Sequence, residues 1–149
     1  MLCWKDSSLR EAVETVCREI GGQGGRAFVV GGAVRDSLLG IPVEDTDVEV
    51  YGLSADRLEA LLKQRFAIET VGRSFAVFKV HHLPLSFSLP RRETKRGPGH
   101  KAFEVIGDSF MEPREAALRR DFTINAMMED PLTGERLDFF GGERDLRAH

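Results

Sequence analysis

One stretch, residues 28–52, constrains the fold more than any other part of the chain. It begins with the apolar, β-branched run Phe28 to Val30, which is typical of a buried strand. Two glycines follow, Gly31 and Gly32, and residues 33–39 then have helical character. Because the first amides of a helix lack partners within it and the helix dipole is positive there, this strand, turn and helix predict a cradle for a phosphate group.

The same stretch carries residues suited to a metal ion. Asp45 and Asp47 fall on a second expected strand, where alternate side chains share a face and lie roughly 7 Å apart at Cα. Mg²⁺ prefers one or two carboxylates together with substrate phosphates, and Arg35 can add a charge-assisted contact to the same anion. Taken singly, a glycine pair is more often a simple turn and two alternating acids a solvated face. Together within one unit they favour a metal-dependent nucleotide site.

Composition limits the remaining possibilities. With 149 residues, of which 42% are hydrophobic, the chain suits one domain with a substantial core. Its formal net charge of −3 gives no general attraction to nucleic acid or anionic membranes. Cys3 and Cys17 are too few for a disulfide framework, and neither a membrane-spanning run nor a signal peptide is evident. We therefore expect a cytoplasmic protein without a membrane partner.

Periodic patterns predict the other elements. A helix is expected over 7–21, opened by a capping box at Ser8 and Glu11, and a second helix follows Ser54. Strands are expected over 66–71, 75–80 and 83–89, with a short one within 136–140. A helix from Pro113 to Arg120 precedes a short one over 124–128, for which Asp121 or Thr123 could provide the cap, while Phe122, Ile124, Met127 and Met128 are expected in the core.

Residues 91–101 are strongly basic and contain Gly97, Pro98 and Gly99. This composition predicts a mobile loop whose Arg91, Arg92 and Lys95 hold triphosphate or RNA backbone. The alternative is a solvated loop with no partner.

Four segments resemble, in the same order, the head domain of the tRNA nucleotidyltransferase (CCA-adding) and poly(A) polymerase family. They are the stretch G-G-x-V-R-D to D-x-D, the run LPRRE from Leu89, the run RRDFTINAM from Arg119, and the segment L-D-x-F-G-G from Leu137. The resemblance implies an α/β fold of the α+β type, related to the DNA polymerase β palm, with a mixed or antiparallel sheet and flanking helices. One head domain would occupy 1–149, with its catalytic core at 26–142.

The resemblance also implies an activity. An RNA 3′-hydroxyl, expected to be that of a tRNA, attacks the α-phosphorus of ATP or CTP and releases pyrophosphate, with two Mg²⁺ ions in the site. Arg73 is a weak candidate for substrate contact, and Asn125 either touches the ribose or holds a neighbouring loop. By resemblance, Asp45 and Asp47 are the catalytic and metal-binding residues, and Gly31, Gly32, Arg35, Arg120, Asp121 and Asn125 bind the nucleotide.

Two departures from the family pattern change these expectations. The family commonly has a third carboxylate five residues before Arg91, where this chain has Ser86, so one of the two ions should bind weakly. Glu49 shares the face of Asp45 but lies about 13 Å along the strand, too far to replace that acid, whereas Glu93 or Glu104 could do so. We therefore expect nucleotide binding to survive better than transfer.

The second departure is length. The family's neck, body and tail domains are not contained in 149 residues, so we expect poor base selectivity and either downstream domains or a partner chain. A non-catalytic nucleotide- or RNA-binding domain is the main alternative. A small-molecule nucleotidyltransferase, such as an aminoglycoside adenylyltransferase, ranks last because such enzymes usually open the site with a G-S turn.

Overall fold

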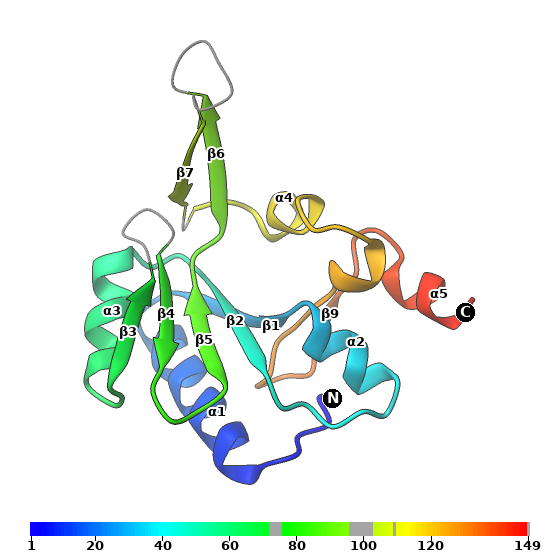
Figure 1. Ribbon diagram of the computed structural model, residues 1–149, viewed down its shortest axis with the longest axis horizontal. Coiled ribbons are helices and arrows are strands. Elements are labelled where there is room, and N and C mark those ends of the chain that lie inside the picture. The colour runs from blue at the N-terminus through cyan, green and yellow to red at the C-terminus, as the bar shows by residue number, and fades with distance from the viewer. Residues whose placement is uncertain (72–75, 96–102, 109, 149) are drawn as a thin grey trace.

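The computed structural model describes residues 1–71, 76–95, 103–108 and 110–148. A seven-stranded mixed sheet in the order β3-β4-β5-β2-β1-β8-β9 forms its centre (Figure 1). Strands β2 and β5 run parallel, whereas β2 pairs with β1 in the antiparallel sense. This arrangement confirms the expected α/β fold with a mixed sheet. The strands are β1 Arg26–Val30, β2 Thr46–Tyr51, β3 Ile68–Val71, β4 Val77–Val80, β5 Leu85–Ser88, β8 Met128–Glu129 and β9 Arg136–Leu137.

Two helices, α1 (Ser7–Gly22) and α3 (Ala55–Lys63), cover one face of the sheet. The apolar residues of both helices recur every three or four positions, so they form stripes that pack against the strands. Alternation directs Ala27 and Val29 of β1, and Val48 and Val50 of β2, into the same cluster. Burial of these side chains fixes the register of the two strands, since a slip by one residue would turn them toward the opposite face.

The opposite face carries the intervening residues and is covered less completely. Phe28 and Val30 pack there with Met128 and with Ala116 and Ala117 of helix α4 (Pro113–Leu118). Helix α2 (Gly32–Leu38), the 3-10 helix η1 (Thr123–Asn125) and helix α5 (Gly142–Arg147) lie beyond the end of β1 (Figure 1). Asp47 and Glu49 therefore share this face with Phe28 and Val30.

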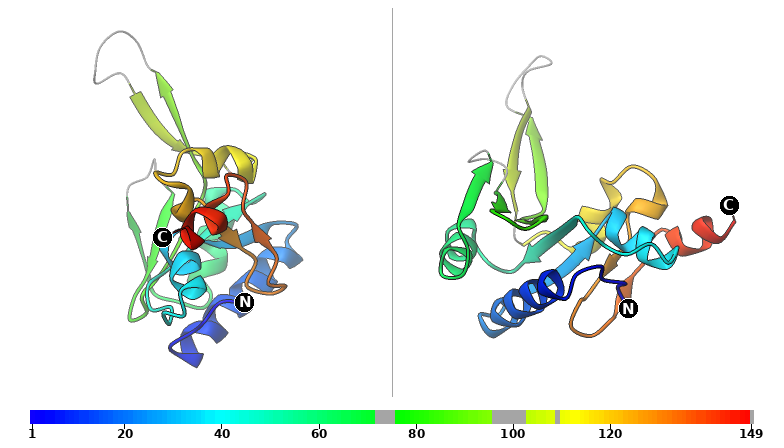
Figure 2. Two further views of the ribbon diagram at one scale, coloured as in Figure 1. Left: turned by 90° about the vertical axis from the view of Figure 1, so that its right-hand side faces the viewer. Right: turned by 60° about the horizontal axis from the view of Figure 1, so that its bottom comes forward.

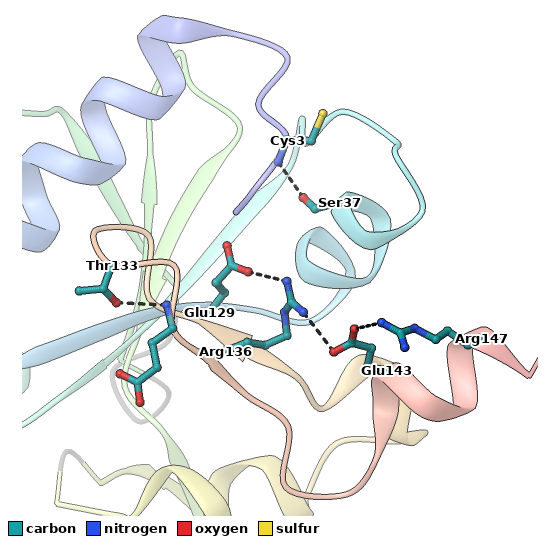
Figure 3. Close-up of polar contacts among 8 residues, drawn as sticks. Cys3, Ser37, Glu129, Thr133, Arg136, Glu143 and Arg147 are labelled. Atoms are coloured by element: carbon teal, nitrogen blue, oxygen red, sulfur yellow. Dashed lines mark hydrogen bonds and ion pairs between the residues drawn. The ribbon is translucent and has the colours of Figure 1, made fainter.

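A chain of ion pairs connects α5 to the edge of the sheet. Arg136 on β9 contacts Glu129 on β8 and Glu143 on α5, each at 3.1 Å, and Glu143 also pairs with Arg147 at 2.6 Å (Figure 3). Glu129 is almost fully buried. A buried carboxylate needs a charged partner. These linked ion pairs therefore hold β8, β9 and α5 together.

Strands β6 (Arg91–Lys95) and β7 (Phe103–Gly107) form a separate two-stranded sheet. The hairpin extends away from the seven-stranded sheet (Figures 1 and 2). The expectation of a loop is therefore wrong for residues 91–95, because these residues pair with a strand that the composition of 91–101 does not reveal. Residues 96–101 lie outside the described part of the chain.

Smaller differences concern the ends of elements. The helix expected over 7–21 is confirmed, but Asp6 caps it by accepting the amide of Ser8, so Ser8 is not the capping residue. The short helix expected over 124–128 is a single 3-10 turn capped by neither Asp121 nor Thr123, and Met128 lies on β8. Met127 and Met128 are buried as expected, but Phe122 has a φ of 65° and is 75% exposed, so its place in the core was wrong.

Within the described ranges, no helix is both long and apolar enough to cross a bilayer.

Candidate active site

The turn between β1 and α2 brings two guanidinium groups against two glycines. Gly31 has a φ of 72° and a ψ of −135°, a conformation that side-chain-bearing residues rarely adopt. A Cβ atom at Gly31 would lie 3.4 Å from Nη1 of Arg120, and one at Gly32 would lie 3.2 Å from Nη2 of Arg35. The missing side chains thus allow both positive groups to approach the backbone at the start of α2.

Arg35 is held in place by its neighbours. Its Nε donates to Oδ1 of Asp36 at 3.0 Å, and its Nη1 donates to Oδ1 of Asn125 at 2.8 Å. Asn125 belongs to η1, so the bond connects the glycine turn to the segment that follows α4. The structure thus shows Asn125 bonded to Arg35, and contact with the ribose or with a neighbouring loop stays a prediction.

The acid pair opens into the cavities beside this turn. Asp47 lies on β2, but Asp45 lies at a bend just before Thr46, so the expectation that both sit within one strand is wrong. Both carboxylates are exposed and line a cavity of about 600 Å³ together with Gly32 and Arg35. They also line a neighbouring cavity of about 430 Å³. The bend does not separate the two acids.

Ser86 lies where the third carboxylate was expected. The parallel register of β2 and β5 places it directly opposite Asp47, and its hydroxyl donates to Oδ1 of Asp47 at 2.5 Å. In the part of the chain that the structure describes, no group of three or more His, Cys, Asp or Glu residues could hold a metal ion. Asp45 and Asp47 fit Mg²⁺ as a pair of hard oxygen ligands that phosphate oxygens would complete.

Asp47 also lines a further cavity of about 350 Å³. It is lined by Ser86 and Ser88 of β5, by Glu49 of β2 and by Arg91, Arg119 and Arg120. Nη2 of Arg120 contacts Oε2 of Glu49 at 3.2 Å, and the hydroxyl of Tyr51 donates to Oε1 of Glu49. Burial, together with the charge of Glu49, raises the pKa of Tyr51, so this hydroxyl remains a donor.

Sequence reasoning considered Glu49 only as a metal ligand and missed its pairing with Arg120. One signal was available. Glu49 interrupts an apolar strand, and a carboxylate on such a strand needs a partner when it is buried.

The remaining candidates are less informative. Arg91 lines the cavity of about 350 Å³, and Asp121 is exposed directly after Arg120. The backbone of Arg92 and Lys95 lies in β6, but their side chains are outside the described structure, as is the whole of Arg73.

Comparisons with known proteins agree with this geometry. The Poly A polymerase head domain family matches residues 27–149. A Multifunctional CCA protein of Xanthomonas oryzae pv. oryzae (strain MAFF 311018) is 44% identical over 123 residues, which cover 83% of this chain and 29% of the relative. The Multifunctional CCA protein of Methylococcus capsulatus (strain ATCC 33009 / NCIMB 11132 / Bath) is 43% identical, with 83% and 28% covered.

Solved structures give the same result. The crystal structure of the Bacillus stearothermophilus CCA-adding enzyme in complex with CTP has a TM-score of 0.72 and 27% identity, covering 93% of this chain and 32% of that one. A tRNA nucleotidyltransferase complexed with a primer tRNA and an incoming ATP analog has a TM-score of 0.64 and 34% identity, with 89% and 36% covered.

This chain spans between 28% and 36% of the length of the proteins just described. The family match extends from β1 to the final residue and thus includes the glycine turn, the acid pair and both arginines. The chain belongs to the poly(A) polymerase head domain family.

Proposed function

We propose that the chain is the head domain of a metal-dependent RNA nucleotidyltransferase. It would add AMP or CMP from ATP or CTP to an RNA 3′ end, first of all that of a tRNA, and release pyrophosphate. The observation that carries the proposal is the pair of guanidinium groups against Gly31 and Gly32. Arg35 lines the cavity of about 600 Å³ with Asp45 and Asp47, and Arg120 lines the cavity of about 350 Å³ with Asp47. Relatives with CTP, or with a primer tRNA and an ATP analog, support the substrate class.

The residues divide the work between charge and position. Arg35 and Arg120 would bind the triphosphate from the two sides of the glycine turn, and Asn125 keeps Arg35 directed toward it. Asp45 and Asp47 would hold Mg²⁺, which when bound supplies positive charge to the phosphate oxygens. No covalent intermediate is needed, because the protein contributes orientation and preorganised charge.

A second candidate function is supported by Ser86. This residue presents a hydroxyl, which carries no charge, where a third carboxylate was expected, and the hydroxyl already donates to Asp47. A head with this substitution could bind nucleotide or RNA without catalysing transfer. Both candidate functions use the phosphate cradle. They differ in whether Asp47, with Ser86 beside it, supports transfer.

The test compares binding with incorporation. Titration with ATP and CTP in magnesium establishes binding, and radiolabelled ATP or CTP with a tRNA lacking its 3′ end measures transfer. We expect both, with transfer lost in the Asp47→Asn variant. Binding without transfer, even at tRNA concentrations high enough to offset a weak grip on tRNA, would favour the non-catalytic domain, and no binding of either nucleotide would refute both candidates.

Base selectivity belongs to the same proposal. Full-length relatives extend well beyond this chain, so downstream domains or a partner chain would supply the choice of base and the grip on tRNA. We expect ATP, CTP, GTP and UTP to bind this chain with similar affinity. A strong preference for one base would show that the head itself selects.

A further inference from the structure

Glu49 is an unexpected residue in a site for a polyanion. It lies two positions after Asp47 on the same face of β2 and lines the same cavity. Its side chain is only 9% exposed, and a buried carboxylate is costly unless it is paired and hydrogen-bonded. A negative charge at this place opposes triphosphate binding. Its presence therefore calls for a role other than binding the nucleotide.

Both oxygens of Glu49 are used. Oε1 accepts the hydroxyl of Tyr51, and Oε2 contacts Nη2 of Arg120 at 3.2 Å. Tyr51 is itself buried and packs edge-on against Phe28, with ring centroids 5.9 Å apart. Tyr51 therefore fixes the carboxylate, and the carboxylate has little freedom to turn toward a metal ion.

The other end of this network reaches the glycine turn. Arg120 follows α4, and its Nη1 is the atom that a Cβ at Gly31 would approach to 3.4 Å. Its Nε is buried and has no hydrogen-bond partner among the described residues. Among the described residues, the contact between Nη2 of Arg120 and Glu49 is thus what holds this guanidinium, which faces the phosphate cradle.

We propose that Glu49 is a positioning residue that holds Arg120 over Gly31 before the nucleotide arrives, with Tyr51 holding Glu49. The inference rests on the proposed function, because it assigns Arg120 to the transferred nucleotide. A free arginine side chain samples many rotamers, and preorganised charge stabilises a transition state better than charge that must first be arranged. Glu49 lowers the net charge at the cradle and in return fixes the direction of Arg120.

The chain contains a matched control. Glu129 is also a buried carboxylate paired with an arginine, Arg136, at 3.1 Å, and Nε of Arg136 is likewise buried without a hydrogen-bond partner among the described residues. This pair lies on β8 and β9 and connects them to α5 (Figure 3). Glu129→Gln therefore reproduces the structural cost of Glu49→Gln away from the cradle.

The experiment has a kinetic part at a magnesium concentration that saturates the wild-type protein. We expect Glu49→Gln to lower kcat for ATP incorporation by at least about tenfold, but by less than the removal of a stabilising donor itself would. KM should change by less than about threefold, since removal of an opposing charge offsets the loss of orientation. Glu129→Gln should leave both constants unchanged. In an Arg120→Ala background, Glu49→Gln should have no further effect on kcat, because its action passes through Arg120.

A second part does not depend on transfer. The Nε–H signals of Arg120 and Arg136 in ¹⁵N-correlated NMR spectra report whether each guanidinium is held. We expect Glu49→Gln to shift or broaden the signal of Arg120 alone, and Glu129→Gln that of Arg136 alone. If the wild-type protein binds ATP without transferring it, the proposed function fails, and the NMR comparison still decides whether Glu49 holds Arg120.

Three results would overturn the proposal. The first is an unchanged Arg120 signal in Glu49→Gln. The second is a loss of kcat in Glu129→Gln equal to that in Glu49→Gln. The third is a Glu49→Gln enzyme that recovers its full rate at higher magnesium, which would make Glu49 a metal ligand.

Discussion

The position of Ser86 yields a prediction about charge. In Ser86→Asp, a second carboxylate replaces the hydroxyl that donates to Oδ1 of Asp47 at 2.5 Å. The two residues face each other across β2 and β5 in fixed register, so the new charge cannot avoid Asp47 without leaving the face of the sheet. Ser86→Asn has the same shape without the charge and is the matched control.

The size of the effect follows from the geometry. Two unit charges about 4 Å apart repel by about 1 kcal/mol in water and about 4 kcal/mol at an effective dielectric constant of 20. Asp47 is exposed, which favours the lower half of this range. For a domain of this size, 1 kcal/mol shifts Tm by about 2–4 °C. We therefore expect Ser86→Asp to melt about 2–10 °C below Ser86→Asn when magnesium is removed by a chelator.

Magnesium should reverse this difference. A divalent cation neutralises the repulsion and gains a ligand, so the Tm of Ser86→Asp should rise with magnesium more steeply than that of Ser86→Asn or the wild-type protein. The rate of ATP incorporation into a tRNA lacking its 3′ end should increase in Ser86→Asp alone.

Thermal unfolding with and without magnesium, followed by the incorporation assay, tests each step. Equal Tm values for Ser86→Asp and Ser86→Asn in chelator would refute the adjacency of position 86 and Asp47. A normal magnesium response with no increase in rate would instead show that another group already fills the role of the third carboxylate.

Other predictions use the glycine turn and the buried thiol. Gly31→Ala and Gly40→Ala both place a side chain at positive φ, 72° and 76°. Each should therefore lower the free energy of unfolding by about 1–3 kcal/mol in denaturant titrations. Only Gly31→Ala should weaken ATP binding, because a Cβ at Gly40 meets no atom within 4 Å. Arg35→Ala should weaken ATP binding about ten- to a hundredfold in the same titration, the value of a hydrogen bond to a charged group. Burial raises the pKa of the Cys17 thiol to about 12, so a thiol reagent at neutral pH should modify the exposed Cys3 alone, as mass spectrometry would show. The pKa of Cys17 in the folded protein lies above the unfolded value of about 8.5. The contribution of this thiol to the free energy of unfolding is therefore fully present below a pH of about 8.5 and decreases as the pH rises toward the folded pKa.

Local sequence patterns were sufficient for much of the fold. The stripe of apolar residues gave α1 to within one residue, and strict alternation over 83–89 correctly buried Leu85, Phe87 and Leu89. These features depend on neighbours within a few positions. The β6–β7 hairpin was missed because its strands meet only through pairing across an intervening segment, which the basic composition of 91–101 does not report.

In the candidate site, too, proximity between neighbours in the sequence was predicted and contacts between distant residues were missed. Gly31, Gly32 and Arg35 lie within one turn, so their proximity was readable from spacing. The contacts between Arg120 and Glu49 and between Arg35 and Asn125 join residues 71 and 90 positions apart. Such contacts depend on how the strands and helices pack, and a single sequence does not encode them locally.

The charge of the cavity beside Asp47 connects these observations. Among the described residues, three arginines line it against two carboxylates, Asp47 and Glu49, and Glu49 is paired with Arg120. A carboxylate at position 86 would balance these lining charges, whereas Ser86 leaves their sum positive. A net positive cavity attracts phosphate and holds a cation less firmly. The substitution at position 86 therefore acts in opposite directions on the two steps, and this is the physical reason to expect nucleotide binding to be retained more fully than transfer.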